Sequence, residues 1–305
     1  MRPAGLRRLR IPLALAAAAA VAAVTAVVAS SGSVRSDGAH ARAAAPTYYL
    51  ALGDSLSQGV QPDAAGVSLE TRYGYPDQVY AALRGDHPAL QLVKLGCPGE
   101  TTSTMISGGI CRYRGGSQLA AAVAFLNAHR GRVFLVTIDI GANDPEACGG
   151  QPALGTIASC VGTGIPAAVT RLTTIMARLV AAAGPGVRMV GMTYYLPALA
   201  DWRDGLPGHA VAWLAEKVAA TYNQWLDRVY ANSGARVADV FGAFHTADFA
   251  KQGTSAGAGT VPRNVALLCQ WTWACAAPPR GPNQHANQAG YQVIARTFLQ
   301  AAGLR

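Results

Sequence analysis

Charged and aromatic residues are scarce in this 305-residue chain. Only 13% of the residues are charged and 7% are aromatic, whereas 51% are hydrophobic. This balance excludes an intrinsically disordered protein and is enough for a sizeable core. The formal net charge is +9, but six arginines against one aspartate in residues 1–43 account for five of these charges. The rest of the chain lacks a basic stripe with interleaved aromatics, so we expect no nucleic-acid partner. Contact with a membrane surface or cell wall stays open.

The N-terminal residues have the pattern of an export signal. A basic stretch at 2–10 precedes an uncharged, Ala-rich run at 11–29. We predict a signal peptide over residues 1–29, with residue 43 as the later alternative for its end. The apolar run just reaches the length of a membrane span, so an N-terminal anchor is the alternative to a secreted protein.

Small and polar residues at 30–46 follow this leader and predict a linker. No second linker and no internal repeat interrupt the remainder. The sequence therefore predicts one domain over residues 47–305, which we expect to be a monomer.

The chain also lacks CxxC and HxxxH spacings, which argues against a structural zinc site. It has six cysteines, all beyond the leader. An even number of cysteines in an exported chain predicts disulfides. The cysteines fall into three local couples, and the simplest of the 15 pairings joins them as Cys97–Cys111, Cys148–Cys160 and Cys269–Cys275.

Strand-like and helix-like segments alternate after residue 47. The strand candidates are apolar without clean alternation, which is typical of strands covered on both faces; they lie at 47–52, 90–95, 132–140, 187–195 and 235–241. The helix candidates lie at 76–83, 117–129, 166–184, 208–234 and 287–303. This order predicts an α/β fold with a five-stranded parallel sheet between two layers of helices. Residues 242–284 show little periodicity, and we expect a long functional loop there.

Polar and glycine-rich segments follow the strands. Gly53-Asp54-Ser55 follows the first strand, residues 96–102 the second and residues 141–145 the third, and residues 281–287 precede the last helix. Ligands in parallel α/β sheets bind at the carboxyl ends of the strands. We therefore expect these four segments to meet at one edge.

These segments contain the groups that acyl transfer requires. A serine hydroxyl needs a base to take its proton, and the developing oxyanion needs hydrogen-bond donors. Ser55 is the candidate nucleophile and His285 the candidate base. The main-chain N–H groups of Ser55 and Gly99 and the side chain of Asn143 are the candidate oxyanion donors. We interpret Asp54 and Asp144 as structural.

The four segments resemble the four sequence blocks of the SGNH hydrolases, the GDSL esterase/lipase superfamily, and most of all its secreted actinobacterial members. The matching residues are Ser55 in Gly-Asp-Ser, Gly99 in Pro-Gly-Glu, Asn143 in Gly-Ala-Asn-Asp, and His285, in the order of the family and within residues 48–303. The resemblance implies a flavodoxin-like three-layer α/β/α fold and hydrolysis of a small-molecule or lipid ester through an acyl-enzyme. It implies no metal and no cofactor.

One block departs from the family pattern. The family usually has Asp three residues before the histidine, but Pro282 stands there, and no carboxylate follows Asp248. The imidazole can be oriented by the main-chain carbonyl of Pro282 or a neighbour, or by the side chain of Asn283. We favour the carbonyl, which predicts that Asn283→Ala keeps most activity.

The substrate is open at this stage. A lipase or phospholipase is the first expectation, and a carbohydrate acetyl esterase or an acyltransferase is the alternative. The missing acid also leaves open a catalytically dead cell-wall binding protein on the same fold.

Overall fold

The computed structural model describes residues 45–144, 160–250, 252–255 and 259–304. They belong to one compact unit, Ala44–Arg305. The predicted signal peptide and most of the predicted linker lie outside the described residues, as does Cys148.

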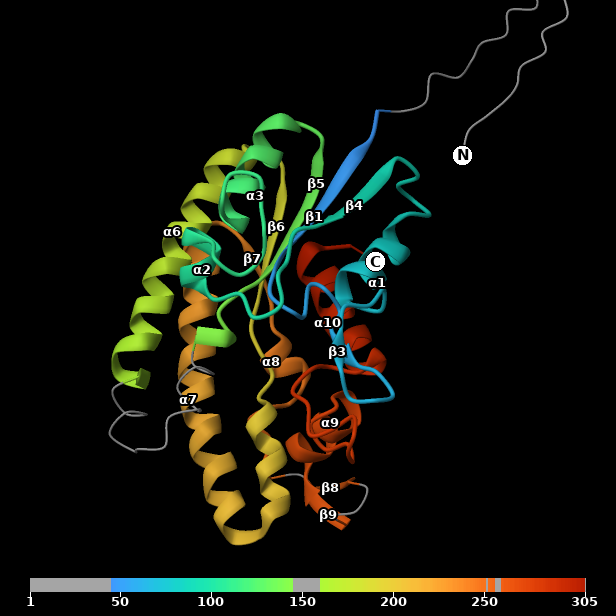
Figure 1. The fold of residues 1–305 in the computed structure, drawn as a ribbon, viewed down its shortest axis with the longest axis vertical. Helices are drawn as coiled ribbons and strands as arrows, with labels where there is room; N and C mark the ends of the chain where they lie inside the picture. Colours follow the sequence, from blue (N-terminus) through green and yellow to red (C-terminus); the bar gives the residue numbers. More distant parts are fainter. Residues whose placement is uncertain (1–44, 145–159, 251, 256–258, 305) are drawn as a thin grey trace, which may run out of the picture. The chain divides into compact units, whose positions relative to one another are not determined.

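A five-stranded parallel sheet forms the centre of this unit (Figure 1). Its strands, in spatial order, are β4 (Leu90–Lys94), β1 (Thr47–Gly53), β5 (Val133–Asp139), β6 (Arg188–Met192) and β7 (Arg236–Ala238). All four pairings are parallel, and Gly53 at the end of β1 pairs with Asp139 at the end of β5.

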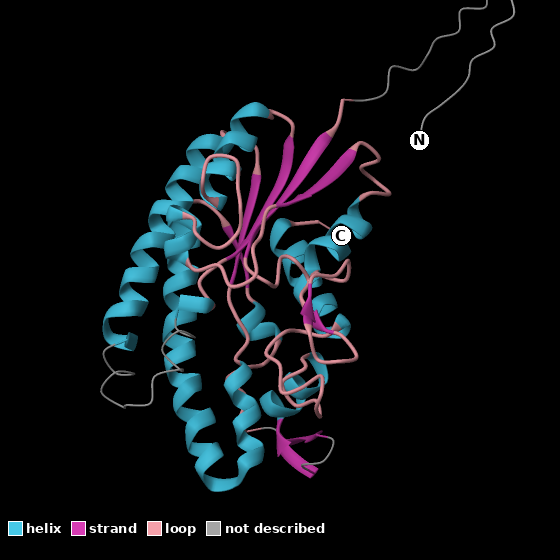
Figure 2. Cartoon of the chain, in the orientation of Figure 1, coloured by secondary structure: helices cyan, strands magenta, loops and turns pink. Residues whose placement is uncertain are grey.

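Helices cover both faces of the sheet (Figure 2). One layer contains α2 (Thr102–Ser107), α3 (Gln118–Ala128), α6 (Ile165–Ala183) and α7 (Gly205–Asn232). The other contains α1 (Tyr75–Leu83) and α10 (Gln288–Ala302). This confirms the predicted three-layer α/β fold. Tyr49 to Leu52 are all fully buried in β1, an interior strand of the sheet, which explains why β1 shows no alternation.

Helix α6 is unusually apolar, and its burial in the core explains this. Residues Gly162–Ala183 are long and apolar enough, by length and composition, to cross a membrane. However, α6 buries Leu172, Ile175 and Leu179 completely, and its Arg171 pairs with a buried aspartate. These contacts are typical of a core helix.

The C-terminal third differs from the prediction of a long loop at 242–284, which is wrong in part. A hairpin of β8 (Gln252–Ser255) and β9 (Gly259–Pro262) precedes α9 (Arg263–Trp271). Helix α9 is only nine residues long and buries Val265 and Leu268 on one side. An apolar pattern this short is a weak signal for a helix in the sequence.

Further short elements also escaped prediction. They are the hairpin of β2 (Gln61–Pro62) and β3 (Ser68–Leu69), the 3₁₀-helix η2 (Pro197–Asp204), the π-helical turn η1 (Cys160–Gly164) and α8 (Val240–Ala243). Helix α8 also shortens the expected strand 235–241, because Asp239 caps α8 with a bond to Gly242 N.

Two of the three predicted disulfides are present. Cys97 is joined to Cys111, and Cys269 to Cys275. The third predicted pair includes Cys148, which lies outside the described residues. Each observed bond closes a local loop, as the spacing predicts.

Candidate active site

The structure brings the four predicted segments to the carboxyl edge of the sheet. A cavity of about 400 Å³ is lined by Ser55, Gly99, Asn143 and His285. A smaller chamber of about 40 Å³ shares three of these residues, Ser55, Asn143 and His285, and is also lined by Tyr194 and Tyr195. The candidate nucleophile, base and oxyanion donors therefore line two hollows that have residues in common.

A larger hollow of about 560 Å³ lies elsewhere, between η2 and the loop before His285. It contains Asp201, Asp204 and His209 but none of the four predicted residues. This hollow would be the candidate active site by volume alone. The cavity of about 400 Å³ is the better candidate because it unites a nucleophile, a base and oxyanion donors. Among the described residues, no group of three or more His, Cys, Asp or Glu is arranged to hold a metal ion.

A tight turn presents Ser55 at the end of β1. Gly53 has φ +134°, and a Cβ there would collide with the main-chain oxygen of Asp139. Only glycine fits this close approach without strain. The turn is closed by hydrogen bonds from Gln58 N and Val60 N to Ser55 O, at 3.2 and 3.1 Å. Ser55 itself is only 9% exposed.

A buried pair of carboxyl groups lies beneath this turn. Asp54 accepts a hydrogen bond from Leu56 N at 2.9 Å, and Asp139 accepts one from the Tyr75 hydroxyl at 2.6 Å. Burial raises the pKa of both groups. The charge of Asp54 raises the pKa of Asp139 further. Burial therefore favours the protonated form of Asp139.

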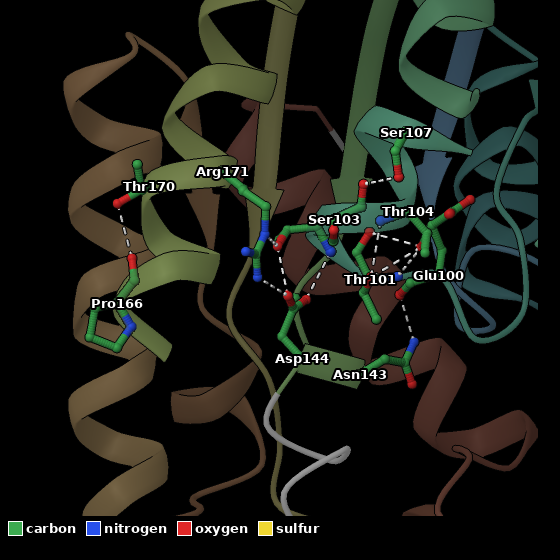
Figure 3. Close-up of polar contacts among 12 residues, drawn as sticks. Glu100, Thr101, Ser103, Thr104, Ser107, Asn143, Asp144, Pro166, Thr170 and Arg171 are labelled. Carbon is green, nitrogen blue, oxygen red and sulfur yellow. Dashed lines mark hydrogen bonds and ion pairs between the residues drawn. The ribbon is translucent and has the colours of Figure 1, made fainter. Parts of the chain in front are cut away.

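The candidate oxyanion donors come from the next two strand ends. Gly99 has φ +81°, a backbone conformation that favours glycine. Asn143 donates one side-chain N–H to the main-chain oxygen of Glu100 at 2.8 Å (Figure 3). A primary amide carries two N–H donors, so this bond orients Asn143 and leaves its second donor for a ligand.

Asp144 ties these two segments together. Its carboxylate accepts from Thr102 N at 2.8 Å, from Thr102 Oγ1 at 2.6 Å and from Arg171 at 3.1 Å (Figure 3). It thus joins the end of β5 to the start of α2 and to α6. The structural interpretation of Asp144 agrees with these contacts.

His285 lies in the loop before α10. Its Nδ1 is 2.8 Å from Asn283 Oδ1, and Tyr195 donates its hydroxyl to the neighbouring Gln284 carbonyl at 2.8 Å. Burial lowers the pKa of His285 to about 4. Within the described residues no hydrogen bond joins Ser55 Oγ to the imidazole, and such bonds often tighten only when substrate binds.

Our preference for the main-chain carbonyl of Pro282 as the orienting group is therefore wrong in this structure. The side chain of Asn283 folds back and accepts from both His285 N, at 3.0 Å, and Nδ1. Asparagine makes such contacts two residues onward because its side chain mimics a backbone turn. The other alternative, Asn283, is the one that the structure favours.

Two supporting residues were missed at the sequence level. Asp139 is a carboxylate inside the apolar run Val136–Ile140, and that break in the pattern was a usable signal. Gln118 binds both main-chain polar groups of Gly53. Nothing in the sequence distinguishes Gln118 from other glutamines near a helix start.

Comparisons with known proteins identify the family and the fold. Residues 51–293 match the GDSL-like lipase/acylhydrolase family. An extracellular lipase from Streptomyces rimosus is similar in fold, with a TM-score of 0.55, 18% identity and coverage of 84% of this chain and 99% of that one. A phospholipase A1 from Streptomyces albidoflavus gives a TM-score of 0.54, 20% identity and coverage of 84% and 100%.

An acetylxylan esterase from Geobacillus stearothermophilus has a TM-score of 0.51, 18% identity and coverage of 86% of this chain and 96% of that one. No curated protein matches the sequence. The family match covers most of the chain, and these structures share its fold. The chain therefore belongs to the GDSL-like lipase/acylhydrolase family and is a carboxylic-ester hydrolase.

Proposed function

We propose that this protein is an exported serine esterase that forms an acyl-enzyme on Ser55. The observation that carries the proposal is the shared pair of hollows, in which Ser55, Asn143 and His285 line both chambers and Gly99 lines the larger one. The cysteine pairs support export, because disulfides persist in oxidising compartments. The similarity to an extracellular lipase supports it further.

Each residue has a defined role in the proposed reaction. Ser55 Oγ attacks the ester carbonyl carbon while His285 Nε2 takes its proton. The Ser55 and Gly99 main-chain N–H groups and the second N–H of Asn143 donate to the oxyanion. His285 then returns the proton to the departing alcohol. Water repeats these steps on the acyl-enzyme and releases the acid.

Lipid esters are the first substrate class that we propose. The larger chamber includes the apolar side chains of Val60, Leu69 and Pro98, and Leu69 is 48% exposed. Apolar walls of this kind favour an acyl chain. Two of the similar structures are a lipase and a phospholipase A1.

An acetylated carbohydrate is the second substrate class. The smaller chamber, of about 40 Å³, has room for little more than an acetyl methyl group. The similarity to an acetylxylan esterase favours the same class. The two classes differ in the length of the acyl group, which can be measured.

The test uses the secreted protein with p-nitrophenyl acetate, p-nitrophenyl octanoate and a serine-directed phosphonate. We expect wild type to hydrolyse ester and to react with the phosphonate, and Ser55→Ala to do neither. Ser103→Ala, an exposed serine on α2, is the matched control. A preference for octanoate supports the lipid class, and a preference for acetate supports the carbohydrate class.

Other outcomes separate the remaining alternatives. Transester product in the presence of an added alcohol would indicate an acyltransferase. An unreactive wild type would refute the serine mechanism and favour a binding protein without activity.

A further inference from the structure

The side-chain amide of Asn283 contacts two different segments. Its Oδ1 accepts from His285 N at 3.0 Å and lies 2.8 Å from His285 Nδ1. Its Nδ2 donates to Ser68 Oγ at 3.0 Å. Asn283 therefore links the β2–β3 hairpin to the candidate base.

These contacts determine the proton position on His285. The main-chain N–H of His285 can only donate, so the amide end that faces it must be the oxygen. An oxygen there requires Nδ1 to carry the ring proton of the neutral imidazole. The lone pair is then on Nε2, where a base for Ser55 needs it.

Ser68 is held in place by the hairpin around it. Trp273 Nε1 donates to Gln61 Oε1 at 3.4 Å, and Gly66, with φ +86°, packs so closely on the main-chain oxygen of Pro279 that a Cβ would collide with it. The hairpin is thus fixed on the loop that leads to His285. Ser68 also lines the larger chamber beside Ser55.

We propose that Ser68 is a positioning residue, and that Ser68, Asn283 and His285 form a neutral relay in place of the family's usual acid. The inference rests on the proposed function of Ser55 and His285. Ser68 holds the amide so that Oδ1 stays on the imidazole and the Nδ1–H tautomer persists. No formal negative charge takes part in this relay.

Because Ser68 lies in the wall of the larger chamber, the effect of removing its hydroxyl on kcat should depend on the substrate. Without the hydroxyl, water can bond to Asn283 Nδ2 while the chamber is open, because Ser68 is exposed. A bulky ester that fills the chamber displaces that water and leaves the amide unsupported. The loss in kcat therefore grows with the size of the substrate.

The test compares Ser68→Ala with Ser68→Thr, which keeps the hydroxyl, and with Val67→Ala at the exposed tip of the same hairpin. We expect Ser68→Ala to lose about 10-fold in kcat on p-nitrophenyl octanoate and less on p-nitrophenyl acetate, as a misplaced catalytic group would. Ser68→Thr should restore the rate. Val67→Ala should match wild type.

A second readout does not depend on turnover. ¹⁵N NMR of the imidazole should show the Nδ1–H tautomer in wild type and a mixture of tautomers in Ser68→Ala. Ser68→Ala with wild-type kcat on both esters and unchanged ¹⁵N shifts would overturn the proposal. If wild type is active and Ser68→Ala behaves like it in this way, the role of Ser68 is refuted but the serine mechanism is not. If wild type itself is inactive, the mechanism fails and the ¹⁵N shifts alone decide the role of Ser68.

Discussion

The side-chain amide of Gln118 forms hydrogen bonds to both main-chain polar groups of Gly53. Gly53 N donates to Gln118 Oε1 at 2.7 Å, and Gln118 Nε2 donates to Gly53 O at 2.9 Å. The same Nε2 lies 3.0 Å from Glu100 Oε2. One buried glutamine thus couples the turn that presents Ser55 to the segment that follows Gly99.

Replacing Gln118 should therefore destabilise the fold. Gln118→Ala leaves the Gly53 N–H buried without a partner and should cost about 2–4 kcal/mol in the free energy of unfolding. Gln118→Glu places a carboxylate against the Gly53 carbonyl and Glu100, so its loss at pH 7 should be larger. Urea denaturation measures both. A Gln118→Glu variant as stable as wild type would contradict a stabilising role for the two hydrogen bonds between Gln118 and Gly53.

Asp144 supports the site through polar contacts that alanine cannot replace. Asp144→Ala removes the acceptor for Thr102 N and for Arg171, and we expect a loss of about 1–3 kcal/mol in the free energy of unfolding. Activity should also fall, because Asn143 is the adjacent residue. Asp227→Ala, an exposed aspartate on α7, is the control for removing a carboxylate. Equal stability of the two variants would refute a role for Asp144 in joining the segments.

The protonation state of Asp139 can be tested with a neutral isostere. If Asp139 is protonated, Asp139→Asn replaces one neutral group by another and keeps an acceptor for the Tyr75 hydroxyl, so its free energy of unfolding should stay within about 1 kcal/mol of wild type. Asp139→Ala removes the short bond of the buried Tyr75 hydroxyl and leaves it only the 3.5 Å contact with Thr137 Oγ1, so it should cost about 1–3 kcal/mol more. Thermal denaturation at pH 7 compares the two. Equal losses in both variants would show that Asp139 is ionised.

The proposed oxyanion role of Asn143 predicts a kinetic effect without a large structural one. Asn143→Ala should reduce kcat by about 10²–10³, the usual cost of removing one oxyanion donor. KM should change little, because the donor acts mainly on the transition state. Steady-state kinetics on p-nitrophenyl acetate measure this. A rise in KM at constant kcat would instead assign Asn143 to ground-state binding.

Patterns that repeat along the chain made the sheet and the long helices predictable. The buried strands are continuous apolar runs, and α6 and α10 began and ended within one residue of the predicted ranges. The four candidate catalytic residues could be predicted for a related reason, because each follows a strand or precedes the last helix. Parallel strands bring such positions to one edge of the sheet.

Contacts between distant side chains were not predictable. Gln118 meets Gly53 across 65 residues, and Asn283 meets Ser68 across 215. Neither pair has a local signature, because what selects it is the register of packed elements. The orienting group of His285 was misjudged for this reason. The sequence shows that an acid is absent, but the direction of the Asn283 side chain depends on its three-dimensional surroundings.

The burial of His285 predicts an unusual pH dependence. Burial lowers the pKa of His285 to about 4, and the base works only when it is unprotonated. The kcat/KM of wild type should therefore decline only below about pH 4 and be flat from there to neutral pH. Asn283→Ala removes the acceptor for Nδ1, and we now expect a loss on the order of 10²-fold instead of near-wild-type activity.

Asn283→Asp should move the acid limb in a defined direction. A carboxylate 2.8 Å from Nδ1 favours imidazolium, so the pKa of His285 rises and the decline in kcat/KM begins at a higher pH. The plateau should rise as well, because the charge also stabilises the imidazolium that forms in the transition state. A decline that stays at about pH 4 in Asn283→Asp would show that residue 283 does not contact the base during turnover.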